Sequence, residues 1–255
     1  MTVRPKKSLG QHFLTDHNIA RKIVDALPPD PPDLLEIGPG TGILSAYLLT
    51  LPGRSSKFIE TDREAVEFLV DKFPEISELI IHNDFLKVDL KTIMRDKYQV
   101  VGNLPYNISS QIFFRILDDR DRVTSAVVMI QKEVADRIIS GPGNKVYGIL
   151  SVLLQTWFRI EYLFTVSPGV FNPPPKVRSA VIRLTRNDVT DIGCDPVYYF
   201  KLVKTAFNQR RKTLRNALKS LLGNIPPSHL DDVLSKRAEQ LSVEDFKSLC
   251  RELEK

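Results

Sequence analysis

The sequence predicts an α/β protein, a mostly parallel sheet between helices, followed by a small all-helical domain. Three observations predict this fold class. Up to about residue 185, short apolar segments alternate with amphipathic helical segments, as in parallel α/β sheets. The apolar segments are almost uninterrupted, as in strands that are covered on both faces. From Val197 onward the sequence shows only helical periodicity.

The individual elements follow from these patterns in order along the chain. Parallel strands are expected at residues 34–38, 57–61, 79–84, 98–103 and 125–130. Helices are expected between and after them at residues 43–50, 63–73, 109–117 and 131–140. Period-2 alternation at residues 160–166 and 177–185 predicts an antiparallel pair at the sheet edge.

Two domains are predicted, residues 1–190 and residues 191–255. The polar segment 186–196 is the expected linker, and "GNIPPSHL" at residues 223–230 interrupts the helical pattern that follows. The first domain carries the candidate catalytic motifs, and the second carries a basic segment.

Composition indicates an ordinary folded protein whose net charge of +5 and pI of about 9.1 favour a polyanionic partner. No apolar run approaches the length of a membrane span or of a signal peptide core, so we expect a soluble, cytoplasmic protein. Cys194 and Cys250 are far apart in sequence, and neither they nor the histidines show metal-ligand spacing. We therefore expect two reduced thiols and no metal site.

The basic segment "YFKLVKTAFNQRRKTLRNALK", residues 199–219, contains no acidic residue. Read as one helix, it places its basic residues on one face and its apolar residues on another. A solvated helix face is the alternative, but such faces usually mix charges of both signs. The segment therefore predicts contact with a nucleic acid, and the candidate residues for binding RNA are Arg210, Arg211, Lys212, Arg215 and Lys219.

A glycine-rich loop, "EIGPGTG" at residues 36–42, separates the first predicted strand from its helix. Glycines at this position let the backbone approach a ligand closely. Gly38 and Gly40 fit the first two positions of a dinucleotide fingerprint, but Ile43 occupies the last. This spacing suits a ligand without a pyrophosphate, although the loop alone could be a structural turn.

Acidic residues follow the next two strands. Glu60, 22 residues beyond Gly38, can accept the hydroxyls of a ribose. Asp84 can accept the exocyclic amine of an adenine, with Phe85 beside it for stacking. Each acid alone could be a helix cap. In this order within one α/β unit they predict an adenosine site, and without a phosphate cradle the natural ligand is S-adenosylmethionine.

The fourth strand ends in "NLPY", residues 103–106. The N6 amine of adenine is a poor nucleophile because its lone pair is delocalised, so its methylation requires acceptors for the amine hydrogens. Asn103 can supply a side-chain carbonyl, and Leu104 a backbone carbonyl because Pro105 favours an extended Leu104. Tyr106 can stack on the base. These residues are predicted to be catalytic, and an ordinary proline turn is the alternative.

A second aromatic residue is a candidate for the target pocket. Phe171 precedes three consecutive prolines, and this stiff segment can hold an aromatic ring at a pocket mouth. We predict that Phe171 belongs to the catalytic set. Core packing beneath the loop is the alternative.

Six segments carry a resemblance to a known family: "KSLGQHFL", "LLEIGPGTG", "GNLPYNISS", "MIQKEVADRI", "VFNPPPKVRSAVIRL" and "AFNQRRKTLRNAL". In this order, from about Lys6 to Leu218, they resemble the KsgA/RsmA family of ribosomal RNA adenine N6,N6-dimethyltransferases. The resemblance implies a seven-stranded, Rossmann-like S-adenosylmethionine-dependent methyltransferase fold with a small helical domain. It also implies dimethylation of two adjacent adenosines in the 3′-terminal hairpin loop of small-subunit (16S) ribosomal RNA during subunit assembly.

The resemblance assigns residues as well. It places His12 and Leu14 near the cofactor. Many members have Asn where this chain has His12, so side-chain and backbone contacts both stay open there, and a backbone contact would survive the difference. It places Gly38 in the cofactor loop, Glu60 on the ribose and Asp84 at the adenine. The target pocket is assigned to Asn103, Leu104, Pro105, Tyr106 and Phe171, with Asn103 also at the methionine end of the cofactor.

Two alternatives stay open at this point. An enzyme of the macrolide-resistance type would methylate large-subunit ribosomal RNA with the same motif, and "AFNQRRKTLRN" speaks against it. A non-catalytic assembly or transcription factor would keep the fold only to bind nucleic acid, and the intact glycine loop and acids speak against that. We expect small-subunit ribosomal RNA and the immature small subunit as partners, and a monomer.

Overall fold

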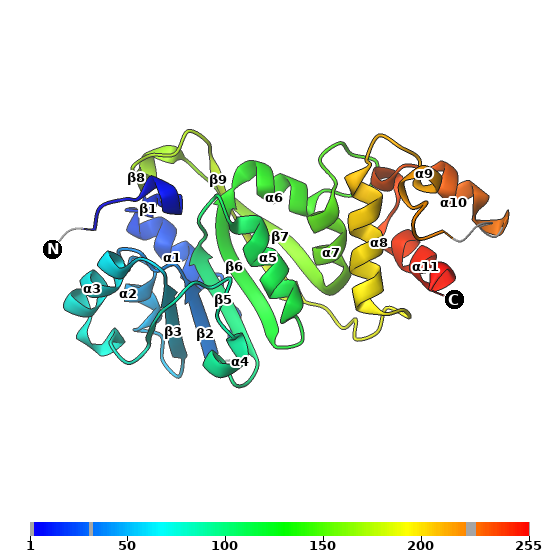
Figure 1. The fold of residues 1–255 in the computed structure, drawn as a ribbon. Coiled ribbons are helices and arrows are strands. Elements are labelled where there is room, and N and C mark those ends of the chain that lie inside the picture. The colour runs from blue at the N-terminus through cyan, green and yellow to red at the C-terminus, as the bar shows by residue number, and fades with distance from the viewer. Residues whose placement is uncertain (1–2, 31–32, 223–227, 255) are drawn as a thin grey trace. The chain divides into compact units, whose positions relative to one another are not determined.

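The structure is a computed structural model of the 255-residue chain and describes residues 3–30, 33–222 and 228–254. Within these ranges seven strands form one sheet, in the order β4-β3-β2-β5-β6-β9-β7 (Figure 1). All seven predicted strands are present, which confirms the predicted α/β class. Their bounds are β2 (Asp33–Ile37), β3 (Ser55–Glu60), β4 (Ile80–His82), β5 (Tyr98–Asn103), β6 (Val123–Gln131), β7 (Phe158–Val166) and β9 (Ser179–Arg186).

The strands β2 to β6 are parallel, and β2 pairs with both β3 and β5. Leu34 lies opposite Ser56 on one side and Gln99 on the other. The side chains of β5 are buried up to Gly102, as expected for a strand in the middle of a parallel sheet. Because the carboxyl ends of parallel strands meet at one edge, the segments that follow β2, β3, β4 and β5 converge there.

The two strands predicted as an edge pair are neighbours, with β7 beside β9 at the edge of the sheet, and β9 runs antiparallel to β6. One further pair was not predicted. The short strands β1 (Phe13–Leu14) and β8 (Phe171–Asn172) pair antiparallel outside the main sheet. Figure 1 shows how this pair brings the N-terminal segment beside the loop that follows β7.

Helices are present at the predicted places, although the one after the glycine loop is shorter than expected, and three further helices, at residues 17–25, 90–93 and 149–157, were not predicted. Helix α2 (Ser45–Leu48) is short because the glycine loop continues as a turn, closed by the Gly42 N–H on the Pro39 carbonyl at 2.9 Å. Helix α7 (Ile149–Trp157) is mostly apolar and almost entirely buried, and its polar side chains are hydrogen-bonded within the protein, as Gln155 is to the Ile138 and Ser140 carbonyls. The other helices are α1 (His17–Asp25), α3 (Arg63–Lys72), α4 (Leu90–Ile93), α5 (Ser109–Asp118), α6 (Lys132–Ile139), α8 (Pro196–Asn208), α9 (Leu214–Ala217), α10 (Asp231–Ser235) and α11 (Val243–Leu253).

The chain divides into two compact units. The first runs up to Ala135 and from Arg159 to Arg186, and the second runs from Asp136 to Phe158 and from Asn187 onward. The last of the three crossings, between Arg186 and Asn187, lies close to the predicted boundary at residue 190. Residues 136–158, assigned from the sequence to the first domain, belong to the second unit because α7 packs against α8 and α11.

Aromatic packing explains this assignment of α7. The ring of Trp157, at the end of α7, stacks on Phe200 of α8 with centroids 5.5 Å apart. The hydroxyl of Thr156 lies 3.0 Å from that of Tyr199. Without these partners the mostly apolar helix α7 would expose a large apolar surface. No helix among the described residues combines the length and apolar character required to cross a bilayer.

Candidate active site

One cavity of about 260 Å³ lies at the carboxyl edge of the parallel strands. Four of the segments that line it follow β2, β3, β4 and β5, and a fifth is the N-terminal segment 8–13. Ligands of open α/β sheets bind at this edge. The cavity brings together ten residues singled out from the sequence: His12, Gly38, Gly40, Glu60, Asp84, Phe85, Asn103, Leu104, Pro105 and Tyr106.

The glycines of the loop after β2 have different tasks. Gly38, Gly40 and Gly42 all have positive φ, at 67°, 57° and 76°, where a side chain would be strained. A Cβ at Gly38 would meet no atom within 4 Å, so its backbone is open to a ligand. A Cβ would lie 2.9 Å from the Phe13 ring at Gly40 and 2.7 Å from Leu69 at Gly42. Those two glycines permit close packing.

The carboxylate of Glu60 is fixed by three backbone N–H groups. Its Oε2 accepts from Gly40 at 3.0 Å, and its Oε1 accepts from Thr61 and Asp62 at 2.9 Å each. Burial raises the pKa of this carboxyl group, although the three hydrogen bonds oppose the shift. Four lone-pair directions are available on a carboxylate, so capacity for a further donor remains. Glu60 therefore ties the glycine loop to the end of β3 while lining the cavity.

Glu36, the last residue but one of β2, was not singled out from the sequence as a site residue. It is 1% exposed and accepts a hydrogen bond from Ser45 Oγ at 2.7 Å. Burial raises its pKa to about 8, and the nearby charge of Glu60 adds to the shift. The signal was present, since an acid interrupts an otherwise apolar strand directly before the loop. At neutral pH its carboxyl group is mostly protonated.

The loop after β4 presents a carboxylate and a ring. Asp84 Oδ1 accepts the N–H of Leu86 at 2.9 Å, and Oδ2 lies 3.6 Å from Lys87 Nζ. Phe85 is 5% exposed and lines the same cavity. An acceptor and a flat apolar surface therefore lie next to each other, as an adenine ring requires.

Strand β5 ends with a fixed amide. Gly102 approaches β2 so closely that a Cβ would lie 2.6 Å from the Ile37 carbonyl oxygen. The Asn103 side chain donates from Nδ2 to the His12 carbonyl at 2.8 Å, which leaves its Oδ1 as the acceptor. Leu104 is buried, and its N–H donates to the Met129 carbonyl at 3.0 Å. The loop backbone is thus held against β6.

His12 and Tyr106 stand between this cavity and a second one of about 730 Å³, and both residues line both cavities. Their ring centroids lie 5.3 Å apart. The Tyr106 hydroxyl lies 2.5 Å from Ser179 Oγ, and His12 Nδ1 lies 2.7 Å from the Pro173 carbonyl. The proline segment 172–177 lines the second cavity, so it borders a pocket as expected.

The structure places the side chains of Phe171 and Leu14 in the hydrophobic core. They are 4% and 2% exposed, face each other in the β1–β8 pair and belong to the hydrophobic core. Neither is among the residues lining the two larger cavities, although Leu14 borders a space of about 20 Å³ under the glycine loop. To stack on a base, the Phe171 ring would have to leave the core. In this structure the Phe171 ring packs in the core, and its role at the target base, like the cofactor contact of Leu14, stays a prediction.

The basic segment 199–219 is not one helix, so the prediction of a single basic face is wrong. Helix α8 ends at Asn208, and α9 begins at Leu214 after a turn. The Leu214 N–H donates to the Lys236 carbonyl at 2.7 Å. The chain turns because Leu214 and Leu218 are both fully buried and must face the interior of their unit.

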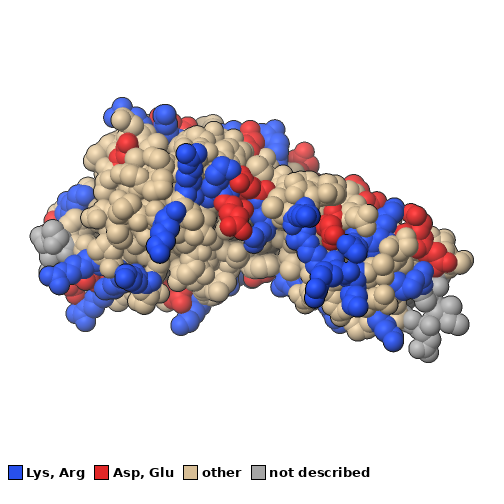
Figure 2. All heavy atoms as spheres, turned by 90° about the horizontal axis from the view of Figure 1, so that it is seen from above, with Lys and Arg blue, Asp and Glu red and all other residues tan. Residues whose placement is uncertain are grey.

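The basic side chains of this segment nevertheless lie mostly at the surface. Figure 2 shows Lys and Arg side chains at the surface in several places, with one group close together in its right half. Arg210 is half-buried, 3.8 Å from Glu239, and Arg215 contacts Asp231 at 2.6 Å. The exposed members of the predicted RNA-binding set are Arg211, Lys212, Arg215 and Lys219.

The two cysteines meet in the second unit although they are far apart in sequence. The Sγ atoms of Cys194 and Cys250 and a carboxylate oxygen of Glu254 lie within 4.8 Å of one another. Burial raises the pKa of both thiols, and both are free. The expectation of no metal site was based on the spacing of cysteines and histidines in the sequence. That spacing gives no information on the contact between Cys194 and Cys250, which are far apart in the chain.

Comparison with known proteins gives the family. The model of the ribosomal RNA adenine dimethylase family matches residues 3–255. The chain belongs to this family. A ribosomal RNA small subunit methyltransferase A from Bacteroides fragilis is 52% identical over 255 residues, which cover 99% of this chain and 93% of the relative. The relative of the same name from Cytophaga hutchinsonii is 51% identical over 254 residues, 98% of each chain. The resemblance found in the sequence motifs is confirmed.

Solved structures confirm the fold. A dimethyladenosine transferase from Plasmodium falciparum matches with a TM-score of 0.78 and 26% identity over 93% of this chain and 96% of that one. The 23S rRNA methyltransferase ErmE matches with a TM-score of 0.70 and 24% identity over 95% of this chain and 100% of that one, which shows a common fold. The seven-stranded Rossmann-like methyltransferase architecture is therefore confirmed.

Proposed function

We propose that this protein dimethylates the N6 amines of two adjacent adenosines in the 3′-terminal hairpin loop of small-subunit (16S) ribosomal RNA, with S-adenosylmethionine as methyl donor. Membership of the ribosomal RNA adenine dimethylase family supports the chemistry. The name of the half-identical relatives favours small-subunit RNA over the large-subunit target of macrolide-resistance enzymes.

The residues of the first cavity fit S-adenosylmethionine. Gly38 leaves open space where a side chain would fill the cavity, Glu60 holds an oriented carboxylate, and Asp84 and Phe85 offer an acceptor beside an aromatic ring. This is the donor set of a nucleoside site without a phosphate cradle. When bound, the cofactor supplies an electrophilic methyl group on a sulfonium.

The observation that carries the proposal is the shared wall of the two cavities. His12 and Tyr106 line both, and Asn103 lies beside them with its Oδ1 available as an acceptor. A methyl donor in the first cavity and an unstacked adenine in the second would meet at this wall. The adenine must leave its base stack to enter, which suits a hairpin loop.

The proposed role of Asn103 is to orient the target nitrogen. Its Oδ1 accepts one amine hydrogen, and the Leu104 carbonyl accepts the other, so that the nitrogen lone pair points toward the methyl group. Pro105 favours the extended conformation of Leu104 that this needs. Tyr106 stacks on the base. No strong base is required, because the amine proton becomes acidic only once methyl transfer begins, and positioning carries the rate.

The proposed partners follow from this substrate. The exposed basic residues of segment 210–219 contact the RNA, the immature small subunit is the natural substrate, and the protein acts in the cytoplasm as a monomer. Phosphate contacts of this kind position an RNA without reading its sequence.

Methylation in vitro tests the proposal. Labelled S-adenosylmethionine is incubated with the protein and either immature small subunits or large subunits lacking their methyl groups. We expect label in the small subunits, and mass mapping should find four methyl groups on two adjacent adenosines, two on each. Label that enters only large-subunit RNA would contradict the proposal, as would a wild-type-like methylation map in cells that lack the protein.

A further inference from the structure

The N-terminal segment Arg4–His12, called the strap below, forms part of the wall of both cavities. Its residues 8–12 line the first cavity, and the second is lined by Pro5, Lys7, Gly10, Gln11 and His12. Apart from one short 3-10 turn (Lys7–Leu9) it contains no regular element. Its position over the cavity therefore depends on contacts with the rest of the unit.

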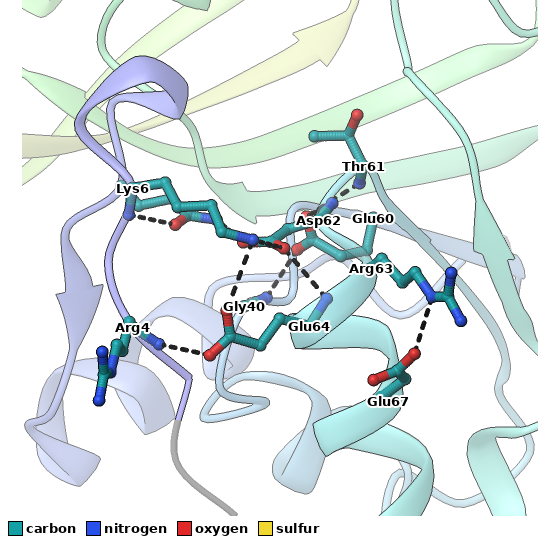
Figure 3. Close-up of polar contacts among 10 residues, drawn as sticks. Arg4, Lys6, Gly40, Glu60, Thr61, Asp62, Arg63, Glu64 and Glu67 are labelled. Carbon is teal, nitrogen blue, oxygen red and sulfur yellow. Dashed lines mark hydrogen bonds and ion pairs between the residues drawn. The ribbon is translucent and has the colours of Figure 1, made fainter.

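Asp62 binds the strap at one end. Its side chain is completely buried, and its Oδ1 forms an ion pair with Lys6 Nζ (Figure 3). Its Oδ2 accepts a hydrogen bond from Gln11 Nε2 at 3.0 Å. Burial alone would raise the pKa of Asp62, but the bonds from Lys6 and Gln11 outweigh it and lower the pKa. Both carboxylate oxygens thus contact the strap.

Asp62 is also connected to the cofactor cavity, although it does not line it. Its N–H donates to Glu60 Oε1 at 2.9 Å, and Glu60 Oε2 accepts from Gly40 at 3.0 Å. Figure 3 shows this chain of contacts from Lys6 through Asp62 and Glu60 to the glycine loop. The strap is therefore bound to Asp62, whose backbone N–H helps to position Glu60, the predicted acceptor for the ribose hydroxyls.

The other end of the strap contacts the loop after β5. Gly10 packs so closely that a Cβ would lie 2.6 Å from Asn107 Oδ1, and its φ is 63°. The His12 carbonyl accepts the side-chain N–H of Asn103. The strap thus crosses the cavity from the acidic loop after β3 to the loop that holds the target amine acceptor.

We propose that Asp62 is a positioning residue that latches the strap over the cofactor cavity and thereby controls how tightly the cofactor is held and how fast it leaves. The inference rests on the proposed function for the identity of the cofactor, S-adenosylmethionine. Asp62 acts through the strap and touches neither the cofactor nor the RNA.

The variants must separate the latch from helix capping, because Asp62 also caps α3 by accepting the Glu64 N–H at 3.1 Å. Asp62→Asn keeps a good cap and removes the charge. Lys6→Met removes the partner charge and leaves the cap intact. Arg63→Gln is the matched control: it breaks the exposed Arg63–Glu67 pair on the same helix and does not contact the strap.

Cofactor binding is measured with S-adenosylmethionine and the full chain in the absence of RNA. Lys6→Met and Asp62→Asn should each weaken cofactor binding about tenfold. This is the loss expected if the fraction of molecules with the strap closed falls tenfold, because the apparent affinity is proportional to that fraction. The cofactor should dissociate faster, and amides of residues 8–12 should exchange faster with solvent. The double variant should lose clearly less affinity than the two single losses added in free energy, because Lys6 and Asp62 contact each other, although each has a further partner, Glu64 for Lys6 and Gln11 for Asp62. Arg63→Gln should match wild type.

Kinetics separate a latch from a general structural defect. The KM for the cofactor should rise about tenfold in both variants, while the KM for RNA stays within twofold and kcat at saturating cofactor within threefold of wild type. Lys6→Arg should restore cofactor affinity. Affinities within twofold of wild type in both single variants, or additive losses in the double variant, would overturn the latch.

This outcome is distinguishable from failure of the proposed function. If the wild-type protein binds S-adenosylmethionine but methylates no small-subunit RNA, the proposed substrate is wrong and the binding experiment still reports on the latch. If wild type methylates small subunits and the variants bind cofactor as wild type does, the latch alone is wrong.

Discussion

The side chain of Asn103 donates its Nδ2 hydrogen to the backbone carbonyl of His12 at 2.8 Å, across 91 positions of sequence. This hydrogen bond determines which amide atom is available at the cavity. The Asn103 Nδ2 is already bonded to His12, so Oδ1 is the atom that can accept a hydrogen bond from a ligand. The orientation of the proposed catalytic amide thus depends on the N-terminal segment and not only on the loop that carries it.

The first prediction concerns this amide. Asn103→Ala should lower kcat for RNA methylation at least 100-fold, because it removes a positioned acceptor whose contribution is electrostatic. RNA affinity should change less than twofold, since it depends on the basic side chains of the second unit. Labelled-cofactor kinetics and filter binding measure the two effects. Methylation at the wild-type rate would contradict the amine contact, and loss of RNA binding would contradict the separation of roles.

The second prediction compares two glycines of one loop. Gly38→Ala should fold with a modest loss of stability, about 1–2 kcal/mol for a side chain at positive φ, and should weaken cofactor binding at least tenfold because its methyl group enters open space at the cavity. Gly42→Ala should lose more stability, because its methyl group would lie 2.7 Å from Leu69 and Phe73. Thermal melts and cofactor titration give the comparison. Equal effects of the two substitutions on both measurements would contradict the division of tasks.

The third prediction concerns pH. Glu36 has a pKa of about 8 in the folded chain against 4.5 ordinarily, because it is buried. Below pH 4.5 the group is protonated in both states. Between pH 4.5 and 8 Glu36 ionises only in the unfolded state, so the unfolded state binds fewer protons than the folded state. The free energy of unfolding therefore decreases as pH rises through this window. Glu36→Gln should therefore be more stable than wild type at pH 9, by up to about 4 kcal/mol, and nearly equal at pH 5. Urea melts of the cofactor-free protein measure this, and a difference independent of pH would contradict it.

The fourth prediction separates the basic residues by their partners. Arg211→Gln and Lys212→Gln remove exposed cations and should each weaken RNA binding several-fold. Each should also reduce the salt slope of log K by about 0.7–0.9 if it neutralises one phosphate. Arg210→Gln should have a smaller effect on RNA binding, because that side chain is half-buried beside Glu239. Binding titrations at several salt concentrations test the order, and a flat salt response would exclude this segment as the main RNA contact.

The fifth prediction asks which aromatic residue meets the target base. Tyr106→Leu should raise the KM for RNA and lower kcat with little loss of stability, because the ring lies at the wall between the cavities. Phe171→Leu should instead destabilise the fold by about 1–2 kcal/mol, because it leaves a space in a packed core. Melting curves and steady-state kinetics on both variants distinguish the roles. A stable Phe171→Leu protein with a strongly raised KM for RNA would support the role predicted from the sequence.

Much of the fold and of the cavity was predictable because it depends on local pattern and on topology. Uninterrupted apolar segments specify buried parallel strands, and parallel strands bring their carboxyl ends together. The residues Gly38, Glu60, Asp84 and Asn103 could therefore be expected at one cavity before any distance was known. The predictions that were wrong concern segments in which tertiary packing overrides the local sequence pattern. The basic segment turns after Asn208 because Leu214 and Leu218 must be buried together, and helical periodicity alone does not record that requirement.

The sequence by itself determined the sheet, the glycine loop, the order of the acids along the strand ends and the family. Each of these follows from residue types at fixed spacings within short segments of the chain. Only the tertiary structure decided which atoms of those residues are available: that Phe171 lies in the core, that Asn103 offers its oxygen, that two distant cysteines meet and that Asp62 binds the N-terminal strap. The physical reason is that burial and hydrogen-bond partnership depend on residues distant in sequence, which no local pattern specifies.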